Sequence, residues 1–405
     1  MLTVIIFILI LGLLVFVHEF GHFVVARKAG IKVHEFALGF PPRLFGWYRD
    51  PATGKNRLVW GKGTKDQKIE RSKDYDTNSK SGQSSNLSIF QSSSYPSTLY
   101  SLNLLPLGGF VKIKGENGED AEDADSFGHK KAWVRATVLA AGVTMNFLLA
   151  AVVLSVGFMI GLPSDVSLLE DKQAILVGEP KVMVQEVEKG SPADLAGIKS
   201  RDTVVSINGE KVTDGEKLRE YIFNHQTEEL SFVVARGEET ETLVMTPKVL
   251  EGMTDRARVG VLLVDAAMVR YPWYIAIYKG FVAAVFTAVN IVIAFWYLIR
   301  NLATGHGLAF DVAGPVGIAV IIGDSARLGI NYLLNTIAML SLSLAVINIL
   351  PIPALDGGRI LFIGLEKILR RPVPMKYEQM AHTIGFVLLM GLIVAVTWRD
   401  VAGLF

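Results

Sequence analysis

The sequence predicts a polytopic α-helical membrane protein of about four spans, with a β-structured loop on the cytoplasmic side and an inserted α+β domain. Three observations predict this fold class. Hydrophobic residues make up 51% of the 405 residues, and the mean hydropathy is +0.38. They gather into runs that approach or exceed the ~20 residues needed to cross a bilayer. Between the runs, alternating segments and turn signals are typical of β-structure.

The apolar runs define the expected spans. They place a first span within residues 1–29, a second at 133–163, a third at 333–365 and a fourth at 380–399. No basic residue precedes the first run, and no small-residue cleavage pattern follows it. We therefore expect a retained span there rather than a cleaved signal peptide.

Basic residues indicate the orientation. Arg27 follows the first run, Lys130 precedes the second, and Lys367 follows the third. The positive-inside rule places these residues in the cytoplasm. The resulting arrangement has residues 30–132 and 366–379 in the cytoplasm and residues 166–250 outside.

A fifth apolar segment lies in the region 251–332, as a helix expected at about 272–303. It is long enough to span but carries Lys279 and Asn290. A single crossing would also put the basic residues after the third run on the outer side. We therefore expect a peripheral or re-entrant helix, with a spanning helix as the alternative.

The cytoplasmic region 30–132 divides into two parts. Residues 48–97 form an insertion rich in Ser, Lys and Gly, which is typical of a flexible loop. A tether and a partner site are both open as its function. Residues 98–116 instead show two alternating stretches separated by Pro106 and Gly108. This pattern predicts a hairpin or looped β-segment.

The region 166–250 shows the signals of a compact α+β domain. Asn208-Gly209 is a strong hairpin turn after a short strand, and residues 214–224 are amphipathic. The run G-S-P-A-D-L-A-G-I-K-S-R-D-T-V-V-S-I-N-G at 190–209 resembles the PDZ domain in its bacterial protease-associated form. The resemblance implies binding of peptide segments by strand addition, and a plain spacer is the alternative.

Composition limits the chemistry. The net charge is +1, so nothing in the balance indicates a nucleic acid partner. The chain has no cysteine, which excludes thiol catalysis and thiolate metal sites. Any metal site must therefore use histidines and carboxylates.

The first span contains His18-Glu19-Phe20-Gly21-His22. His18 and His22 are four residues apart, so both imidazoles project from one face of a helix, as in a zinc site whose Glu takes a proton from water. A pair of interior histidines is the simpler alternative. However, charged groups in a span cost on the order of a few kcal/mol, which favours a functional role.

A hydrolytic zinc site needs a third protein ligand, and Asp356 is the best candidate. It lies in the third run, after Pro351 and Pro353, which interrupt a helix, and before a Gly-Gly pair that allows close backbone approach. Broken backbone at membrane depth is tolerated around protein-lined cavities. The alternative is that Asp356 only caps a helix.

Together, H-E-F-G-H, L-D-G-G and the PDZ-like run resemble the site-2 protease family of intramembrane zinc metalloproteases. The branch most similar is the bacterial regulator-of-sigma-E proteases, which cut the membrane spans of anti-sigma factors. The resemblance implies Zn²⁺ held by His18, His22 and Asp356, and Glu19 as the base that activates a zinc-bound water. It also implies hydrolysis of single-span membrane proteins, such as an anti-sigma factor or a remnant signal peptide, in the bacterial inner membrane, with the PDZ domain on the periplasmic side.

The resemblance also implies substrate contacts. Asn146 falls in a G-x-x-x-N element and Asn348 in an N-x-x-P-x-P-x-L-D-G pattern, and for both an interhelical hydrogen bond is the alternative. Residues 105–112 resemble the family's membrane-associated β-loop, which implies that Gly108, Gly109 and Phe110 contact substrate. A substrate helix must unwind before hydrolysis, and a free β-edge could pair with the extended strand.

Two other functions compete with this interpretation. A soluble-type zinc protease tethered to the membrane would need the motif outside the apolar run, but the sequence places it inside. A catalytically silent membrane adaptor would bind peptides through the PDZ domain and would have no use for the four candidate metal-site residues.

Overall fold

The computed structural model describes residues 2–61, 96–118, 120–166, 171–237, 239–249, 257–305, 313–371 and 373–402. Most of the insertion expected at 48–97 therefore lies outside the described residues. The chain divides into two compact units. The first comprises Met1–Ala150, Phe286–Gly323 and Met339–Phe405, and the second comprises Ala151–Val285 and Asp324–Ala338.

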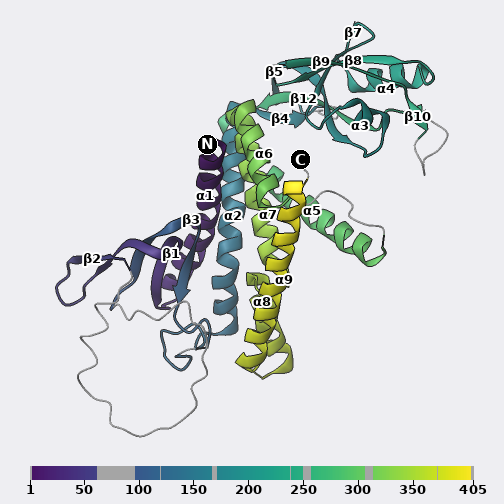
Figure 1. Cartoon of the computed structure of the whole chain (residues 1–405). Coiled ribbons are helices and arrows are strands. Elements are labelled where there is room, and N and C mark those ends of the chain that lie inside the picture. The colour runs from purple at the N-terminus through teal and green to yellow at the C-terminus, as the bar shows by residue number, and fades with distance from the viewer. Residues whose placement is uncertain are drawn as a thin grey trace. The chain divides into compact units, whose positions relative to one another are not determined.

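Five helices in the described part of the chain are long and apolar enough to cross a membrane (Figure 1). They are α1 (Leu2–Lys28), α2 (Ala132–Ile160), α5 (Trp273–Ala303), α7 (Ile330–Ile349) and α9 (Met375–Ala402). About four were expected. The additional candidate is α5, at the position of the helix for which a peripheral location was expected, and its length and hydropathy meet the requirements of a span.

The third apolar run is interrupted rather than continuous. Helix α7 ends at Ile349 and α8 (Asp356–Leu369) begins after a short loop that contains both prolines. A Cβ on Gly357 would lie 2.2 Å from the carbonyl oxygen of Leu350, and one on Gly358 would lie 2.4 Å from that of Ile352. The expectation that this Gly-Gly pair permits close backbone approach is confirmed.

Helices α1 and α2 pack closely at the level of the histidine motif. A Cβ on Gly21 would lie 2.4 Å from the carbonyl oxygen of Ala141, so only glycine fits there. Close approach through small residues is typical of helices that associate in membranes. It brings the α2 backbone within reach of the α1 side chains.

The first unit also contains a sheet in the order β2-β1-β3, formed by β1 (Val33–Arg49), β2 (Asn56–Trp60) and β3 (Leu99–Ile113). The first part of β1 pairs with both ends of β3, for example Leu38 with Gly109 and with Leu102. Residues 109–113 pair only with β1, so they form an edge of the described sheet. Phe23, Val33 and Ile113 share a buried cluster that fixes the sheet to the end of α1.

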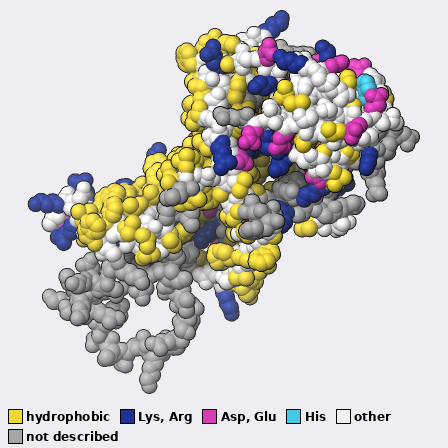
Figure 2. Space-filling model, turned by 45° about the horizontal axis from the view of Figure 1, so that its top comes forward, with side chains coloured by type: hydrophobic (Ala, Val, Ile, Leu, Met, Phe, Trp, Pro, Cys, Tyr) yellow, Lys and Arg dark blue, Asp and Glu magenta, His cyan; other side chains and the backbone are white. Residues whose placement is uncertain are grey.

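The sheet exposes an unusual amount of apolar surface. Figure 2 shows hydrophobic side chains gathered over this part of the molecule. The exposed apolar residues of the sheet are Leu38, Phe40, Leu44, Trp47, Leu58, Trp60, Leu104 and Leu105. Apolar patches of this kind mark interaction with a membrane or a partner, and the sheet is attached to a candidate span.

The second unit contains a sheet in the order β4-β12-β5-β6-β8-β9, with β7 paired to β6. Its strands are β4 (Leu162–Asp165), β5 (Ile175–Val187), β6 (Thr203–Ile207), β7 (Glu210–Lys211), β8 (Leu230–Arg236), β9 (Glu239–Met245) and β12 (Val261–Arg270). The outer pair β4 and β12 extends the sheet beyond the expected range 166–250. The described remainder of the chain adds β10 (Lys248–Val249), β11 (Ala257–Arg258) and α6 (Pro315–Leu328).

Two short helices complete this α+β domain, and the second covers the residues that the sequence shows to be amphipathic. Helix α3 (Pro192–Ala196) is capped by the Ser191 hydroxyl and ends at Gly197 in the left-handed conformation. Helix α4 (Gly215–Asn224) is capped by Asp214. Each cap satisfies amide groups that the first helical turn leaves free.

Candidate active site

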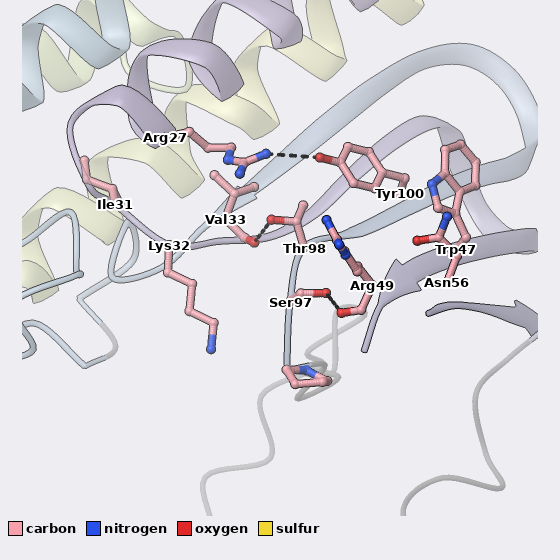
Figure 3. A pocket seen from close by; sticks show the side chains of 11 residues that line it. Arg27, Ile31, Lys32, Val33, Trp47, Arg49, Asn56, Ser97, Thr98 and Tyr100 are labelled. Carbon is pink, nitrogen blue, oxygen red and sulfur yellow. Dashed lines mark hydrogen bonds between the residues drawn. The ribbon is translucent and has the colours of Figure 1, made fainter. Parts of the chain in front are cut away.

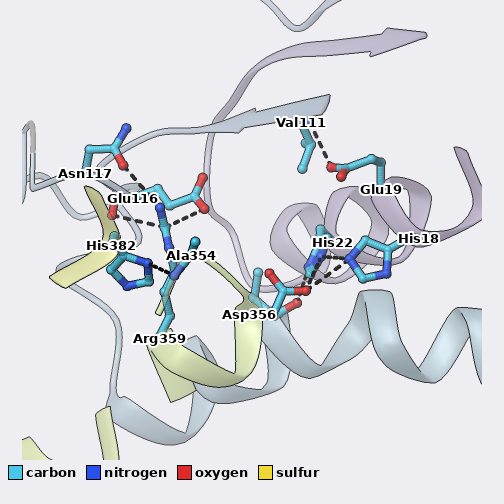
Figure 4. Close-up of polar contacts among 11 residues, drawn as sticks. His18, Glu19, His22, Val111, Glu116, Asn117, Ala354, Asp356, Arg359 and His382 are labelled. Atoms are coloured by element: carbon cyan, nitrogen blue, oxygen red, sulfur yellow. Dashed lines mark hydrogen bonds and ion pairs between the residues drawn. The ribbon is translucent and has the colours of Figure 1, made fainter. Parts of the chain in front are cut away.

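Three candidate metal ligands from distant parts of the first unit converge. His18 and His22 lie one turn apart on α1, and Asp356 is the first residue of α8 (Figure 4). The Asp356 Oδ2 atom is 3.0 Å from His18 Nε2 and 3.3 Å from His22 Nε2. The two Nε2 atoms are 3.1 Å apart, and both histidines are buried.

This donor set fits a zinc ion. Zinc bonds of about 2.0–2.1 Å to nitrogen or oxygen give tetrahedron edges of about 3.3 Å, close to the three separations observed. The donors are two imidazole nitrogens and one carboxylate oxygen. Three protein ligands leave a fourth position open, as in catalytic rather than structural zinc sites.

Groups on helix α2 contact the Nδ1 atom of each imidazole, on the side of the ring away from Asp356. His22 Nδ1 lies 2.8 Å from the carbonyl oxygen of Val138, to which it can only donate. His18 Nδ1 lies 3.3 Å from the Asn146 side-chain amide. A histidine that donates through Nδ1 presents an unprotonated Nε2, which is the form a metal needs.

Asn146 is completely buried and links three helices. Its backbone carbonyl accepts a hydrogen bond of 2.8 Å from the Ser341 hydroxyl of α7. Its side-chain Oδ1 has no partner among the described residues, whereas Nδ2 faces His18. A 180° turn of the amide would exchange these atoms, so that Oδ1 accepts the Nδ1 proton of His18. Asn146 thus makes contacts between helices, and its role as a substrate contact stays a prediction.

Asp356 does not act as a helix cap. The N-cap position of α8 is Leu355, which makes no side-chain capping bond, and the Asp356 carboxylate is directed at the two histidines. The loop before it contains Ala354 with φ +82°, a conformation that a side chain disfavours. The Ala354 amide donates to Nδ1 of His382 on α9 at 2.9 Å.

Glu19 follows His18 on α1 but is directed toward the sheet. Its Oε2 accepts a hydrogen bond of 3.0 Å from the backbone amide of Val111 in β3 (Figure 4). The Val111 amide therefore faces α1 rather than the paired strand β1. The candidate base is thus next to the edge of the sheet.

The other candidate substrate contacts lie in two places. Gly109 packs against β1, because a Cβ there would lie 2.6 Å from the carbonyl oxygen of Ala37. Gly108 has φ +104°, and Phe110 is half-buried. Asn348 is half-buried in the last turn of α7, and its side chain makes no hydrogen bond to described residues.

Gly142 is a site residue that the sequence analysis did not single out. A Cβ there would lie 2.4 Å from His22 Nε2 and 2.7 Å from His18 Nε2. Val138, Gly142 and Asn146 are spaced by four, so all three lie on the α2 face that meets the histidines. This spacing was visible in the sequence, but nothing there showed which helix the face would meet.

Comparisons with known proteins show the family of this chain. The model of "Peptidase family M50" matches residues 6–54 and 85–392. The chain belongs to this family. The resemblance to the site-2 proteases, which form peptidase family M50, is thereby confirmed, and the chain is a metalloprotease of that family.

Relatives match over nearly the whole chain. "Regulator of sigma-W protease RasP" of Bacillus subtilis is 32% identical over 100% of this chain and 99% of its own length. "Zinc metalloprotease RasP" of Geobacillus kaustophilus is 31% identical over 100% of this chain and 98% of its own. A solved PDZ domain of an SdrC-like protein from Listeria monocytogenes aligns at 17% identity over 22% of this chain and 93% of its own, and its TM-score of 0.20 carries no weight for the fold.

Substitution of Gly142 by alanine should displace both imidazoles, because a methyl group would occupy the space beside their Nε2 atoms. We expect zinc affinity to fall by about 10–100-fold, as for other groups that orient metal ligands. The measurement is zinc affinity of the purified protein by competition with a chelating dye. Gly364→Ala on α8 is the control, since its Cβ would meet open space. Equal affinity in the two variants would contradict the placement of Gly142.

Proposed function

We propose that this metalloprotease hydrolyses peptide bonds within or near the transmembrane segments of other membrane proteins, with Zn²⁺ as its cofactor. The observation that carries the proposal is the position of His18 and His22, two of the three candidate metal ligands, inside an apolar helix. His18 precedes the end of α1 at Lys28 by ten residues, which corresponds to about 15 Å along the helix. That depth lies within a hydrocarbon core about 30 Å thick.

The chain's own residues supply binding, orientation and proton transfer. His18, His22 and Asp356 would hold the zinc ion, which acts as a Lewis acid and makes water more acidic when bound. Glu19 then accepts a proton from the attacking water at its carboxylate and passes it to the nitrogen of the departing amine. Val138 and Asn146 keep the two imidazoles in the orientation that the ligand set requires.

The sheet edge would receive the substrate. A helical substrate satisfies its peptide groups internally, so the segment to be cut must first become extended. Residues 109–113 form an edge of the described sheet. The backbone amide of Val111 at this edge donates to Glu19 Oε2, with a distance of 3.0 Å between the two atoms. A substrate strand added to this edge would lie beside the catalytic carboxylate. Gly108, Gly109, Phe110 and Asn348 would then contact it.

The proposed substrates are single-span membrane proteins, such as an anti-sigma factor or a remnant signal peptide. The Bacillus subtilis relative is named a regulator of sigma-W protease, which is consistent with the first class. We further propose that the protein lies in the bacterial inner membrane, with the basic end of α1 in the cytoplasm and the PDZ-like domain outside, where it binds peptide segments. A catalytically silent adaptor is less well supported, because it has no use for a converged metal-ligand set.

The decisive variant is Glu19→Gln, because glutamine keeps the shape and can still accept from the Val111 amide. We expect cleavage to fall by about 10²–10⁴-fold, the range for loss of a general base, while zinc remains bound. The measurement is cleavage of a single-span substrate in liposomes, with zinc content of the same preparations by elemental analysis. A metal-free wild-type protein, or unchanged cleavage in the variant, would refute the proposal.

The substrate path can be tested separately because the chain has no cysteine of its own. In the Glu19→Gln background, we expect Phe110→Cys to form a disulfide with a substrate that carries one cysteine near its cut site. Leu58→Cys on β2 is the control, because it is exposed on the same sheet away from the 109–113 edge. Equal crosslinking at both positions would argue against strand addition at this edge.

A further inference from the structure

The loop that delivers Asp356 to the metal site is held in place from another span. Ala354, two residues before Asp356, has φ +82°, which a residue with a Cβ adopts only when its surroundings impose it. The surroundings include His382 of α9, whose Nδ1 accepts the Ala354 amide at 2.9 Å (Figure 4). A side chain 28 residues further along the chain therefore satisfies the backbone at the strained position.

A second contact fixes the same loop. A Cβ on Gly385 would lie 2.4 Å from the carbonyl oxygen of Pro353, so the α9 backbone abuts the loop directly. Gly385 follows His382 by three residues, so both face the loop from one side of α9. The helix thus contacts two consecutive loop residues, one through its backbone and one through a side chain.

The hydrogen bond also defines the state of the His382 ring. An amide N–H can only donate, so Nδ1 must be unprotonated and the ring neutral, with its proton on Nε2. Nε2 is buried and has no partner among the described residues. Among the described residues, the Ala354 amide is therefore the hydrogen-bond partner of the ring.

We propose that His382 is a positioning residue for Asp356. By holding the Ala354 amide, it keeps the loop in the conformation that starts α8 with the Asp356 carboxylate at 3.0 Å from His18 Nε2. The described contacts of His382 are with Ala354 and Phe362 and not with the candidate metal ligands. The inference rests on the proposed metal site, and it adds α9 to the helices on which that site depends.

The test compares zinc affinity among four variants of the full-length protein. His382→Leu should weaken zinc binding by about tenfold or more, the usual loss when a group that orients a ligand is removed. His382→Asn should keep most of the affinity, because its side-chain carbonyl can accept from Ala354. Ala354→Gly combined with His382→Leu should also restore affinity, because glycine adopts positive φ without strain. Thr383→Val is the control, since its hydroxyl bonds only its own helix at Gln379.

Two results would overturn the inference. One is a His382→Leu variant that binds zinc like the wild type. The other is a loss of zinc affinity in His382→Asn as large as in His382→Leu, with no recovery when Ala354→Gly is added to His382→Leu. That result would indicate general damage to folding. A wild-type protein that binds no zinc would instead refute the proposed function, so the two failures are distinguishable.

A separate observation concerns the basic end of α1. A cavity of about 690 Å³ lies between this end and the sheet of the first unit. Arg27, Lys32 and Arg49 contribute cationic side chains to its lining, and Trp47 and Tyr100 contribute stacked aromatic rings (Figure 3). No acidic residue is among those that line it.

The three cations have no carboxylate partner among the described residues. Arg27 donates to the Tyr100 hydroxyl at 3.3 Å, and Arg49 donates to a backbone carbonyl at 3.3 Å. Lys32 helps to lower the pKa of Asp125, but the main cause of that shift is a hydrogen bond from Lys114. Positive charge is thus concentrated at the cavity and left for another group to neutralise.

The position of the cavity indicates the ligand. Arg27 lies in the last turn of a candidate span, and Trp47 is exposed on a sheet rich in exposed apolar side chains. Basic and aromatic residues at the end of a span lie at the level of the lipid headgroups. We infer that the cavity binds the phosphate headgroup of an anionic phospholipid.

The experiment measures binding of short-chain phosphatidylglycerol to the detergent-purified protein by native mass spectrometry. Substitution of Lys32 and Arg49 together by glutamine should weaken binding by about 30-fold, because each basic residue near a lipid surface contributes roughly fivefold. The control replaces Lys28 and Lys55 by glutamine, which removes the same charge from exposed residues outside the cavity lining. Equal loss in the two double variants would show a general charge effect and overturn the inference.

Two further measurements distinguish a lipid headgroup from a free phosphate as the ligand. Phosphatidylcholine of the same chain length should bind at least about tenfold more weakly, because its headgroup has no net charge. Glycerol 3-phosphate at the same concentration should not displace the lipid. Displacement by glycerol 3-phosphate, or equal binding of both lipids, would contradict an anionic lipid site.

Discussion

The contact between α1 and α2 is the constraint on which the site depends. Gly21 lets the α2 backbone approach α1, and Gly142 leaves room for both imidazoles at that contact. Val138 and Asn146, one turn to either side of Gly142, then engage the far nitrogens of His22 and His18. These contacts orient both imidazoles toward the candidate metal position.

The rest of the site is assembled around this helix pair. Asp356 lies 338 residues after His18, at the start of α8. Helix α8 can begin there because α7 ends at Ile349 and because two glycines directly after Asp356 allow a close backbone approach. Arg359, one turn into α8, pairs with Glu116 at 2.6 Å and so ties α8 to the chain that follows β3. The metal-ligand helix, the Asp356 loop and the sheet edge are therefore coupled through contacts on both sides of the cluster.

The sequence predicted the parts whose signal is local. His18, Glu19 and His22 follow from a five-residue pattern inside an apolar run. The turn at Asn208-Gly209 follows from local residue preferences. Asp356 could be selected because charged residues are rare in such runs. In the structure, its Oδ2 atom lies 3.0 Å from His18 Nε2 and 3.3 Å from His22 Nε2.

Features that depend on contacts between distant segments could not be predicted. Nothing in the sequence around Gly142 shows that imidazoles approach it, and nothing around His382 shows that it meets Ala354. The positive φ of Ala354 was also hidden, because alanine gives no local signal for that conformation. The status of α5 differs, because its length and hydropathy favour a span while the expected charge distribution favours a peripheral position.

The most direct test of the metal site is zinc K-edge X-ray absorption of the purified protein. We expect zinc bound by two imidazoles and oxygen donors at about 2.0–2.1 Å, with no sulfur. The Asp356→Asn protein should keep the imidazole signal but bind zinc more weakly. Zinc held by one imidazole or none, or a spectrum that Gly142→Ala leaves unchanged at equal occupancy, would contradict a site built on the α1–α2 contact.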